Sequence, residues 1–216
     1  MSEHSRIGRP LRRGTNHASA RRDSLLIFTE GKNTEVGYIN FWYRLYRERI
    51  IVEIDDTHGT PMTLVEAALR RRKEEERAEA KGRGAAHTEY WCVFDRDEHP
   101  AFDEAVRIAK REKINLAVSN PCLELWFVWH FEDQAGHIER AAVQSRSRRL
   151  LGCNKTLTRE ALEQLAVVDR YEAAKRRAAT LDTKHDGDGS PTGSNPSSGM
   201  PKLIDRIRQG TGSDRR

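Results

Sequence analysis

Cysteine and long apolar runs are scarce in this sequence. The cysteines, Cys92, Cys122 and Cys153, form no C-x-x-C pair, which argues against a disulfide scaffold or a zinc module. Cys92 and Cys122 lie in apolar segments, so we expect small buried hydrophobes and not nucleophiles. No run of about 18 apolar residues is present, and the Arg-rich N-terminus lacks the apolar stretch of a signal peptide. We therefore expect a soluble, cytoplasmic protein with no membrane partner.

Apolar residues as a whole are also few. They make up 37% of the 216 residues, whereas 33% are charged, against about 25% in a typical domain. The 38 basic and 33 acidic residues leave a net charge of +5. This modest excess permits a polyanionic partner without demonstrating one. A core can form only if the apolar residues are concentrated in particular segments.

The two ends of the chain contain little that could be buried. Residues 1–23 hold six arginines and two acids, which predicts a disordered basic arm. The alternative is an arm that contacts phosphates. Residues 210–216 are expected to form a frayed tail.

Four short apolar runs alternate with helical patterns between residues 24 and 118. Helical spacing covers residues 33–49, a second helix begins at Thr60-Pro61, and a third follows Pro100. The order β-α-β-α-β-α-β predicts an α/β fold with a mostly parallel sheet and helices on both faces. The predicted strands are 25–29, 50–54, 90–94 and 114–118.

The rest of the chain is predicted to be helical. Asn120-Pro121 begins an apolar helix that runs to Phe131 and completes an α/β core over residues 24–132. Its aromatic residues could stack on bases, but packing on the sheet is the preferred interpretation. Residues 133–209 are expected to form a helical C-terminal extension packed on this core, with a flexible loop at 183–200 and a short last helix from Pro201.

Acidic residues follow two of the predicted strands. Glu30 comes after the first strand, and Asp95 and Asp97 come after the third. Ligands of doubly wound sheets bind at the carboxyl ends of strands, where the strand order reverses. Three carboxylates there suit Mg²⁺, or Mn²⁺, and phosphoryl transfer chemistry. The alternative is that Asp95 and Asp97 cap a helix or form a turn before Pro100.

These residues carry a resemblance to known families. Thr29-Glu30-Gly31-Lys32 with Asp95-Arg96-Asp97 resembles the Toprim signature of primases, topoisomerases and small nucleases. A longer set of motifs resembles the RloB-like family over about residues 24–208. The motifs are T-E-G-x-x-T-E (Thr29 to Glu35, with Tyr38 downstream), F-D-R-D (Phe94 to Asp97), S-N-P-C-L-E-L-W (Ser119 to Trp126), H-F-E (His130 to Glu132) and N-P-S (Asn195 to Ser197).

The resemblance implies a Toprim-like fold and a nuclease. Glu30 would be the catalytic base or a metal ligand, and Asp95 and Asp97 would be metal ligands. Relatives are often encoded beside an ATPase in abortive-infection or restriction-associated loci. The resulting hypothesis is a Mg²⁺-dependent nuclease that hydrolyses DNA or RNA, tRNA included, in an anti-phage system. The alternatives are a catalytically inactive subunit of the neighbouring ATPase, and a nucleotidyl transferase or small phosphohydrolase.

Further acids are candidates for the same site. Glu124 lies among apolar residues, where an unpaired carboxylate is costly to bury, so it either faces the site as a catalytic residue or caps its own helix. Glu35 and Glu98 are the other local acids, and the role of His99 is open. Asn195 and Ser197 could return the C-terminal loop to the site, although Ser197 could equally cap the last helix.

Candidate substrate contacts come from basic residues and one histidine. The interval 140–159 has six basic residues and no acid, which suits contact with a phosphate backbone. A solvated lysine is an equal alternative for Lys32, and for His130 a core histidine is the preferred interpretation. The sequence does not distinguish DNA from RNA, and the oligomeric state stays open. The candidates are Lys32, Arg96, His130, Arg146 and Arg148.

Overall fold

A computed structural model describes residues 22–210 of the chain. The predictions for the basic arm and for the tail therefore fall almost entirely outside the described residues. Within 22–210, no helix combines the length and the apolar character needed to cross a bilayer.

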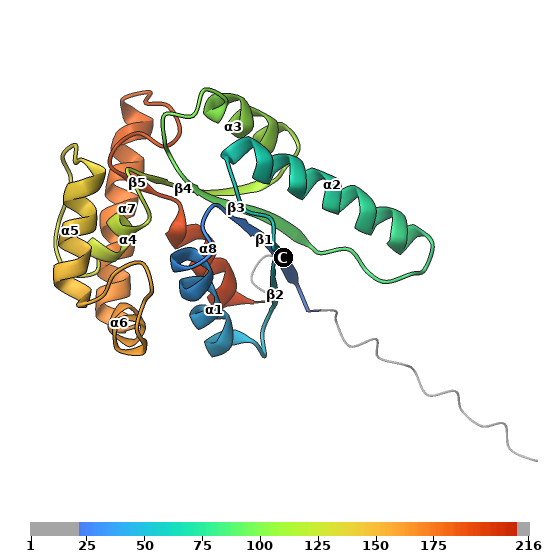
Figure 1. Cartoon of the computed structure of the whole chain (residues 1–216), viewed down its shortest axis with the longest axis horizontal. Coiled ribbons are helices and arrows are strands. Elements are labelled where there is room, and N and C mark those ends of the chain that lie inside the picture. Colours follow the sequence, from blue (N-terminus) through green and yellow to red (C-terminus); the bar gives the residue numbers. More distant parts are fainter. Residues whose placement is uncertain (1–21, 211–216) are drawn as a thin grey trace, which may run out of the picture.

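A five-stranded sheet forms the centre of the molecule (Figure 1). Its strand order is β2-β1-β3-β4-β5. The first four strands are parallel, and β5 pairs antiparallel with β4. The predicted α/β class with a mostly parallel, Rossmann-like sheet is confirmed. The strands are β1 (Ser24–Thr29), β2 (Ile51–Ile54), β3 (Glu89–Asp95), β4 (Asn115–Asn120) and β5 (Ser197–Ser198).

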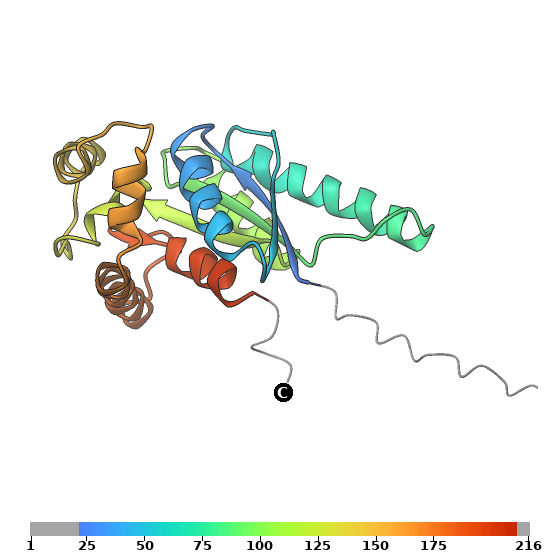
Figure 2. The ribbon, with the colours of Figure 1, turned by 90° about the horizontal axis from the view of Figure 1, so that it is seen from below.

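Both faces of the sheet are covered, which explains why the central strands β1 and β3 are apolar along most of their length. Side chains alternate between faces, so Leu25 and Ile27 enter one core, whereas Leu26 and Phe28 enter the other. Helices α2 (Pro61–Ala80) and α3 (Phe102–Arg111) cover the second face, and α1 (Thr34–Tyr46) and α8 (Met200–Gln209) cover the first. Figures 1 and 2 show these two layers on opposite sides of the sheet.

The remaining helices gather beside the carboxyl ends of the strands (Figure 2). Helix α4 is the most buried of them: its apolar side chains, including Trp126 and Phe127, are at most 1% exposed. These helices complete the larger core and place the residues of α5 close to the ends of β1 and β3. They are α4 (Glu124–Val128), α5 (Arg140–Leu151), α6 (Arg159–Leu165) and α7 (Val168–Gly187).

Two predicted boundaries differ from the structure. The apolar helix expected to run to Phe131 spans only 124–128, because beyond it the amides of His130 and Phe131 donate to carbonyls three residues back and not four. The loop predicted at 183–200 is shorter at both ends, since α7 continues to Gly187 and Ser197-Ser198 forms β5. Strand β5 is too short to show a periodic pattern, and its pairing with β4 depends on tertiary contacts.

Candidate active site

The candidate site lies where the strand order reverses, between β1 and β3. Glu30 directly follows β1, and Asp95 ends β3. The backbone amide of Glu30 donates to the Val93 carbonyl at 3.0 Å, and the amide of Asp95 donates to Oε2 of Glu30 at 2.9 Å. The parallel pairing of β1 with β3 thus brings together two acids that lie 65 residues apart in the sequence.

The chain leaves the strand after Asp95. The Asp97 amide donates to the Asp95 carbonyl at 3.2 Å, so the backbone turns here and does not stay extended. The Arg96 side chain makes its contacts outside the acidic cluster: its guanidinium lies 5.0 Å from the centre of the Phe102 ring and donates to the Thr192 carbonyl at 2.8 Å. Asp97 and His99 come close to Glu30 beyond this turn.

Arg140 is the residue of this site that the sequence did not single out. Its guanidinium donates to Oδ2 of Asp95 at 3.1 Å and also pairs with Asp97. The loop before α5 is held by Asn195, whose side-chain amide accepts from the Ile138 amide at 3.1 Å and donates to the Ile138 carbonyl at 2.9 Å. Asn195 therefore returns to the site as predicted, but it does so by anchoring the segment that carries Arg140.

The acids of this cluster repel one another. Burial raises the pKa of Asp95 well above its usual value, and Glu30, Glu124 and Glu35 raise it further, whereas Arg140 opposes the shift. Burial also raises the pKa of Glu30, with further contributions from Asp97 and Glu35. One guanidinium therefore does not balance the negative charge, and a divalent cation would offset the remainder.

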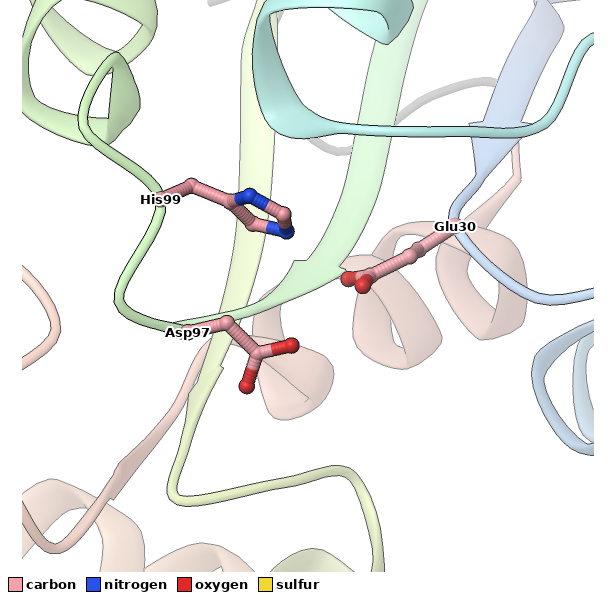
Figure 3. Close-up of side chains that lie close together, drawn as sticks. All are labelled: Glu30, Asp97 and His99. Atoms are coloured by element: carbon pink, nitrogen blue, oxygen red, sulfur yellow. The ribbon is translucent and has the colours of Figure 1, made fainter.

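Glu30, Asp97 and His99 form the group best placed to hold such a cation. One ligand atom from each lies within 4.8 Å of the others, and the three side chains converge in Figure 3. Two oxygens and an imidazole nitrogen fit a divalent ion. This set differs from the predicted Glu30, Asp95 and Asp97, because Asp95 is the more buried of the two aspartates that pair with Arg140. The spacing Asp95-x-Asp97-x-His99 was the available signal for His99.

Two clefts flank the carboxylates. A cleft of about 260 Å³ is lined by Glu30, Asp95, Glu124 and the basic residues Lys32 and Lys155. Glu124 therefore faces the site, and Lys32 is exposed at its edge. Arg140 separates this cleft from a second one of about 460 Å³. The second cleft includes Arg96, Asp97, His99, Asn120 and Asn195.

Three predicted substrate contacts lie outside these clefts. His130 is 2% exposed, and its Nδ1 donates to the Trp126 carbonyl at 2.8 Å, so the structure places it in the core and out of reach of a phosphate. Arg146 lies on α5 and contacts Gln134 and Glu132, whereas Arg148 is exposed on the same helix.

The structure also tests the predictions for two cysteines and for Ser197. Cys92 and Cys122 are fully buried, and burial raises the pKa of both thiols, in agreement with their predicted role as small hydrophobes. Ser197 does not cap α8: the first amide of that helix, that of Met200, donates to Ser198 Oγ at 3.3 Å.

Fold and site together define a doubly wound α/β protein with an acidic cluster at its topological switch point. The model of the family described as RloB-like protein matches residues 25–207 of the chain. The protein therefore belongs to the RloB-like family. No curated protein and no solved structure gives a significant match.

Proposed function

We propose that this protein is a metal-dependent nuclease of the Toprim type that hydrolyses phosphodiester bonds in DNA or RNA. The observation that carries the proposal is the convergence of Glu30 with Asp95 and Asp97 at the carboxyl ends of β1 and β3. Ligand sites of doubly wound sheets lie at this position.

The residues of the site would have different roles in phosphodiester hydrolysis. A bound Mg²⁺ or Mn²⁺ ion would neutralise phosphate charge and lower the pKa of a water molecule. Glu30 and Asp97 would hold the ion. Since Oε2 of Glu30 accepts from the Asp95 amide, Oε1 is the oxygen left to hold the ion. Arg140 and Lys32 line the cleft where they would bind phosphate oxygens.

The family resemblance supports the biological part of the proposal. We place the enzyme in the cytoplasm as the effector of an anti-phage abortive-infection system, with a neighbouring ATPase as its partner. The exposed basic residues Arg148 and Arg149 on α5 would add contacts to a nucleic-acid backbone that do not depend on base sequence.

Substitution of the carboxylates tests the proposal. Glu30→Gln and Asp95→Asn should each abolish cleavage of DNA, RNA or tRNA in the presence of Mg²⁺ or Mn²⁺, and toxicity in cells, because each removes a charge at the centre of the site. Cleavage is measured by sequencing the ends of the products, with and without the ATPase. Asp56→Asn is the matched control: Asp56 is an exposed acid after β2 that lies outside the cluster.

Undiminished cleavage in both purified site variants would contradict the proposal. Mononucleotides and nucleoside triphosphates are assayed in parallel, because a nucleotidyl transferase or a small phosphohydrolase would use the same metal geometry. Turnover of these small substrates without cleavage of any polynucleotide would replace the nuclease with that third class.

The Arg140 ion pairs favour a second candidate, a catalytically inactive module that regulates the neighbouring ATPase. Arg140 already provides positive charge to Asp95 and Asp97, so part of the acidic cluster is compensated within the chain. A stable complex with the ATPase that binds no divalent ion at Glu30 and Asp97 would favour this candidate. Loss of metal binding in Glu30→Gln relative to wild type would favour the nuclease.

A further inference from the structure

We propose that His99 is a ligand of the divalent ion and makes the site prefer a first-row transition ion, with Mn²⁺ as the probe, to Mg²⁺. The inference rests on the proposed function, because it concerns the ion of the same site. It adds a third ligand and a metal preference that three carboxylates alone would not produce.

The surroundings of its ring separate His99 from the other histidines. Six histidines lie within residues 22–210, and in five of them a ring nitrogen is within hydrogen-bond distance of a protein oxygen. These five pairs are His58 with the Thr29 carbonyl, His87 with Glu75, His130 with the Trp126 carbonyl, His137 with Glu139, and His185 with the Pro196 carbonyl. The ring of His99 has no such partner in this part of the chain, although it is half-buried beside two carboxylates.

The carboxylates of Glu30 and Asp97 each have one oxygen left to bind an ion between them and the His99 ring. Glu30 uses Oε2 for the Asp95 amide, and Asp97 uses Oδ1 for Arg140. The carboxylate of Glu30 and the ring of His99 point toward each other from two different elements, with Asp97 beside them (Figure 3). The space therefore offers two oxygens and one nitrogen.

The backbone of His99 is held at the start of α3. Pro100 follows His99 directly and restricts the chain, and the Phe102 amide donates to the His99 carbonyl at 3.0 Å in the turn that begins α3. The Phe102 side chain is buried in the core. These contacts fix the backbone from which the His99 side chain extends toward Glu30 and Asp97.

The two carboxylate oxygens and the imidazole nitrogen determine which metal ion the site should prefer. Mg²⁺ requires near-ideal octahedral geometry, is bound by oxygen and retains its water ligands, so an imidazole adds little to its binding. Imidazole nitrogen is a good ligand for first-row transition ions, whose affinity for nitrogen sites rises along the series from Mn²⁺. Loss of the ring should therefore weaken Mn²⁺ binding far more than Mg²⁺ binding.

Direct binding measurements on the metal-free full chain test the inference. Mn²⁺ affinity is obtained from the electron paramagnetic resonance signal of the free ion, and Mg²⁺ affinity from competition. Wild type should prefer Mn²⁺, and His99→Ala should weaken Mn²⁺ binding by about tenfold or more, the scale on which metal-site substitutions act. Binding of Mg²⁺ should change much less.

Two further variants test whether the effect on Mn²⁺ binding is specific to the imidazole of His99. His99→Gln places a neutral oxygen near the position of the ring nitrogen, so it should keep Mg²⁺ binding and lose the preference for Mn²⁺. His137→Ala removes an exposed histidine outside the cluster and should bind both ions as wild type does. Circular dichroism and thermal unfolding without metal confirm that each variant is folded.

The outcomes separate this inference from the proposed function. An unchanged ratio of Mn²⁺ to Mg²⁺ affinity in His99→Ala would overturn the role of His99 and leave a metal nuclease in place. An equal change in His137→Ala would also overturn it. Failure of wild type to bind either ion would remove both the inference and the metal-dependent function.

Discussion

The two histidines that lie in or beside the family-like motifs, His99 and His130, have opposite surroundings. The ring of His99 lies beside two carboxylates, whereas the ring of His130 is packed against Trp126 and Tyr171. In His130, Nδ1 carries the proton that is donated to the Trp126 carbonyl, and Nε2 is buried with no hydrogen-bond partner among residues 22–210. The sequence around a histidine does not distinguish a ring that faces a metal site from a ring in the core, because the difference lies in the side chains that the fold packs against each ring.

The buried ring of His130 predicts a pH dependence of stability. Burial lowers its pKa to about 4, with smaller contributions from Arg170 and Arg177. Since the unfolded chain binds the proton at about pH 6.5, the stabilising contribution is complete above that value and is lost as the pH falls from 6.5 through 4. The loss should reach about 3 kcal/mol, the value that linkage assigns to such a shift.

The variant His130→Phe should remove this slope, because a phenyl ring binds no proton. The free energy of unfolding is measured by urea denaturation from pH 7 to pH 4 in both proteins, and the difference between them isolates the histidine from the titrating acids of the site. An identical pH profile for the two proteins would contradict the assignment of a buried neutral ring. His137→Phe, at an exposed position, should keep the wild-type slope.

At the scale of elements, Gly199 controls how β5 and α8 join the sheet. A Cβ atom at this position would lie 2.8 Å from Cα of Ala117 and 2.9 Å from the amide nitrogen of Val118, both in the backbone of β4. The amide of Gly199 donates to the Val118 carbonyl at 2.8 Å. A side chain would therefore push β5 and α8 away from β4.

The substitution Gly199→Ala should destabilise the protein by about 1–3 kcal/mol, because overpacking against a backbone cannot be relieved by a side-chain rotation. Gly37→Ala is the matched control. Gly37 lies in α1, and apart from its chain neighbours and the backbone of α1 itself no atom of the described residues lies within 4 Å of an added Cβ, so alanine should stabilise the protein by about 0.5–1 kcal/mol. Thermal unfolding measures both changes. Equal stability of the two variants would contradict the close approach of β5 to β4.

At the scale of the whole molecule, Arg140 links the helical C-terminal part to the ends of the strands. It pairs with Asp95 and Asp97 from the first turn of α5, and Asn195 anchors the loop that precedes that turn. The residues involved come from three regions of the chain. Charge balance at the site therefore depends on how the C-terminal helices pack, and not on the sheet alone.

Removal of this link should lower stability and change the response to metal. In metal-free buffer Arg140→Gln should cost about 2 kcal/mol, less than a fully buried pair would, since Arg140 is partly exposed. Mn²⁺ should then raise the unfolding temperature of the variant more than that of wild type, because the guanidinium no longer competes for the carboxylates. Arg148→Gln, at an exposed position on α5, should leave metal-free stability unchanged. A smaller response to Mn²⁺ in Arg140→Gln than in wild type would contradict this competition.

The sequence by itself determined the class of fold and three of the acids in the site. Runs such as 25–29 and 90–94 are short-range patterns, and parallel strands bring their carboxyl ends to one edge, so local features place Glu30 and Asp95 at the same edge, whereas their contact depends on the pairing of β1 with β3. The same patterns left the small strand β5 undetected. They also left both roles of Glu124 open until the structure placed it in the cleft.

Only the tertiary structure decided which partners complete the site. Arg140 lies 45 residues from Asp95, and its position depends on a loop held by Asn195, which lies 57 residues from Ile138. No periodic pattern records such a contact, because it depends on the packing of α4 to α8 around the sheet. The same packing placed His130 in the core and left His99 beside Glu30 and Asp97. Local patterns thus specify which face or edge a residue occupies, and long-range packing specifies what it meets there.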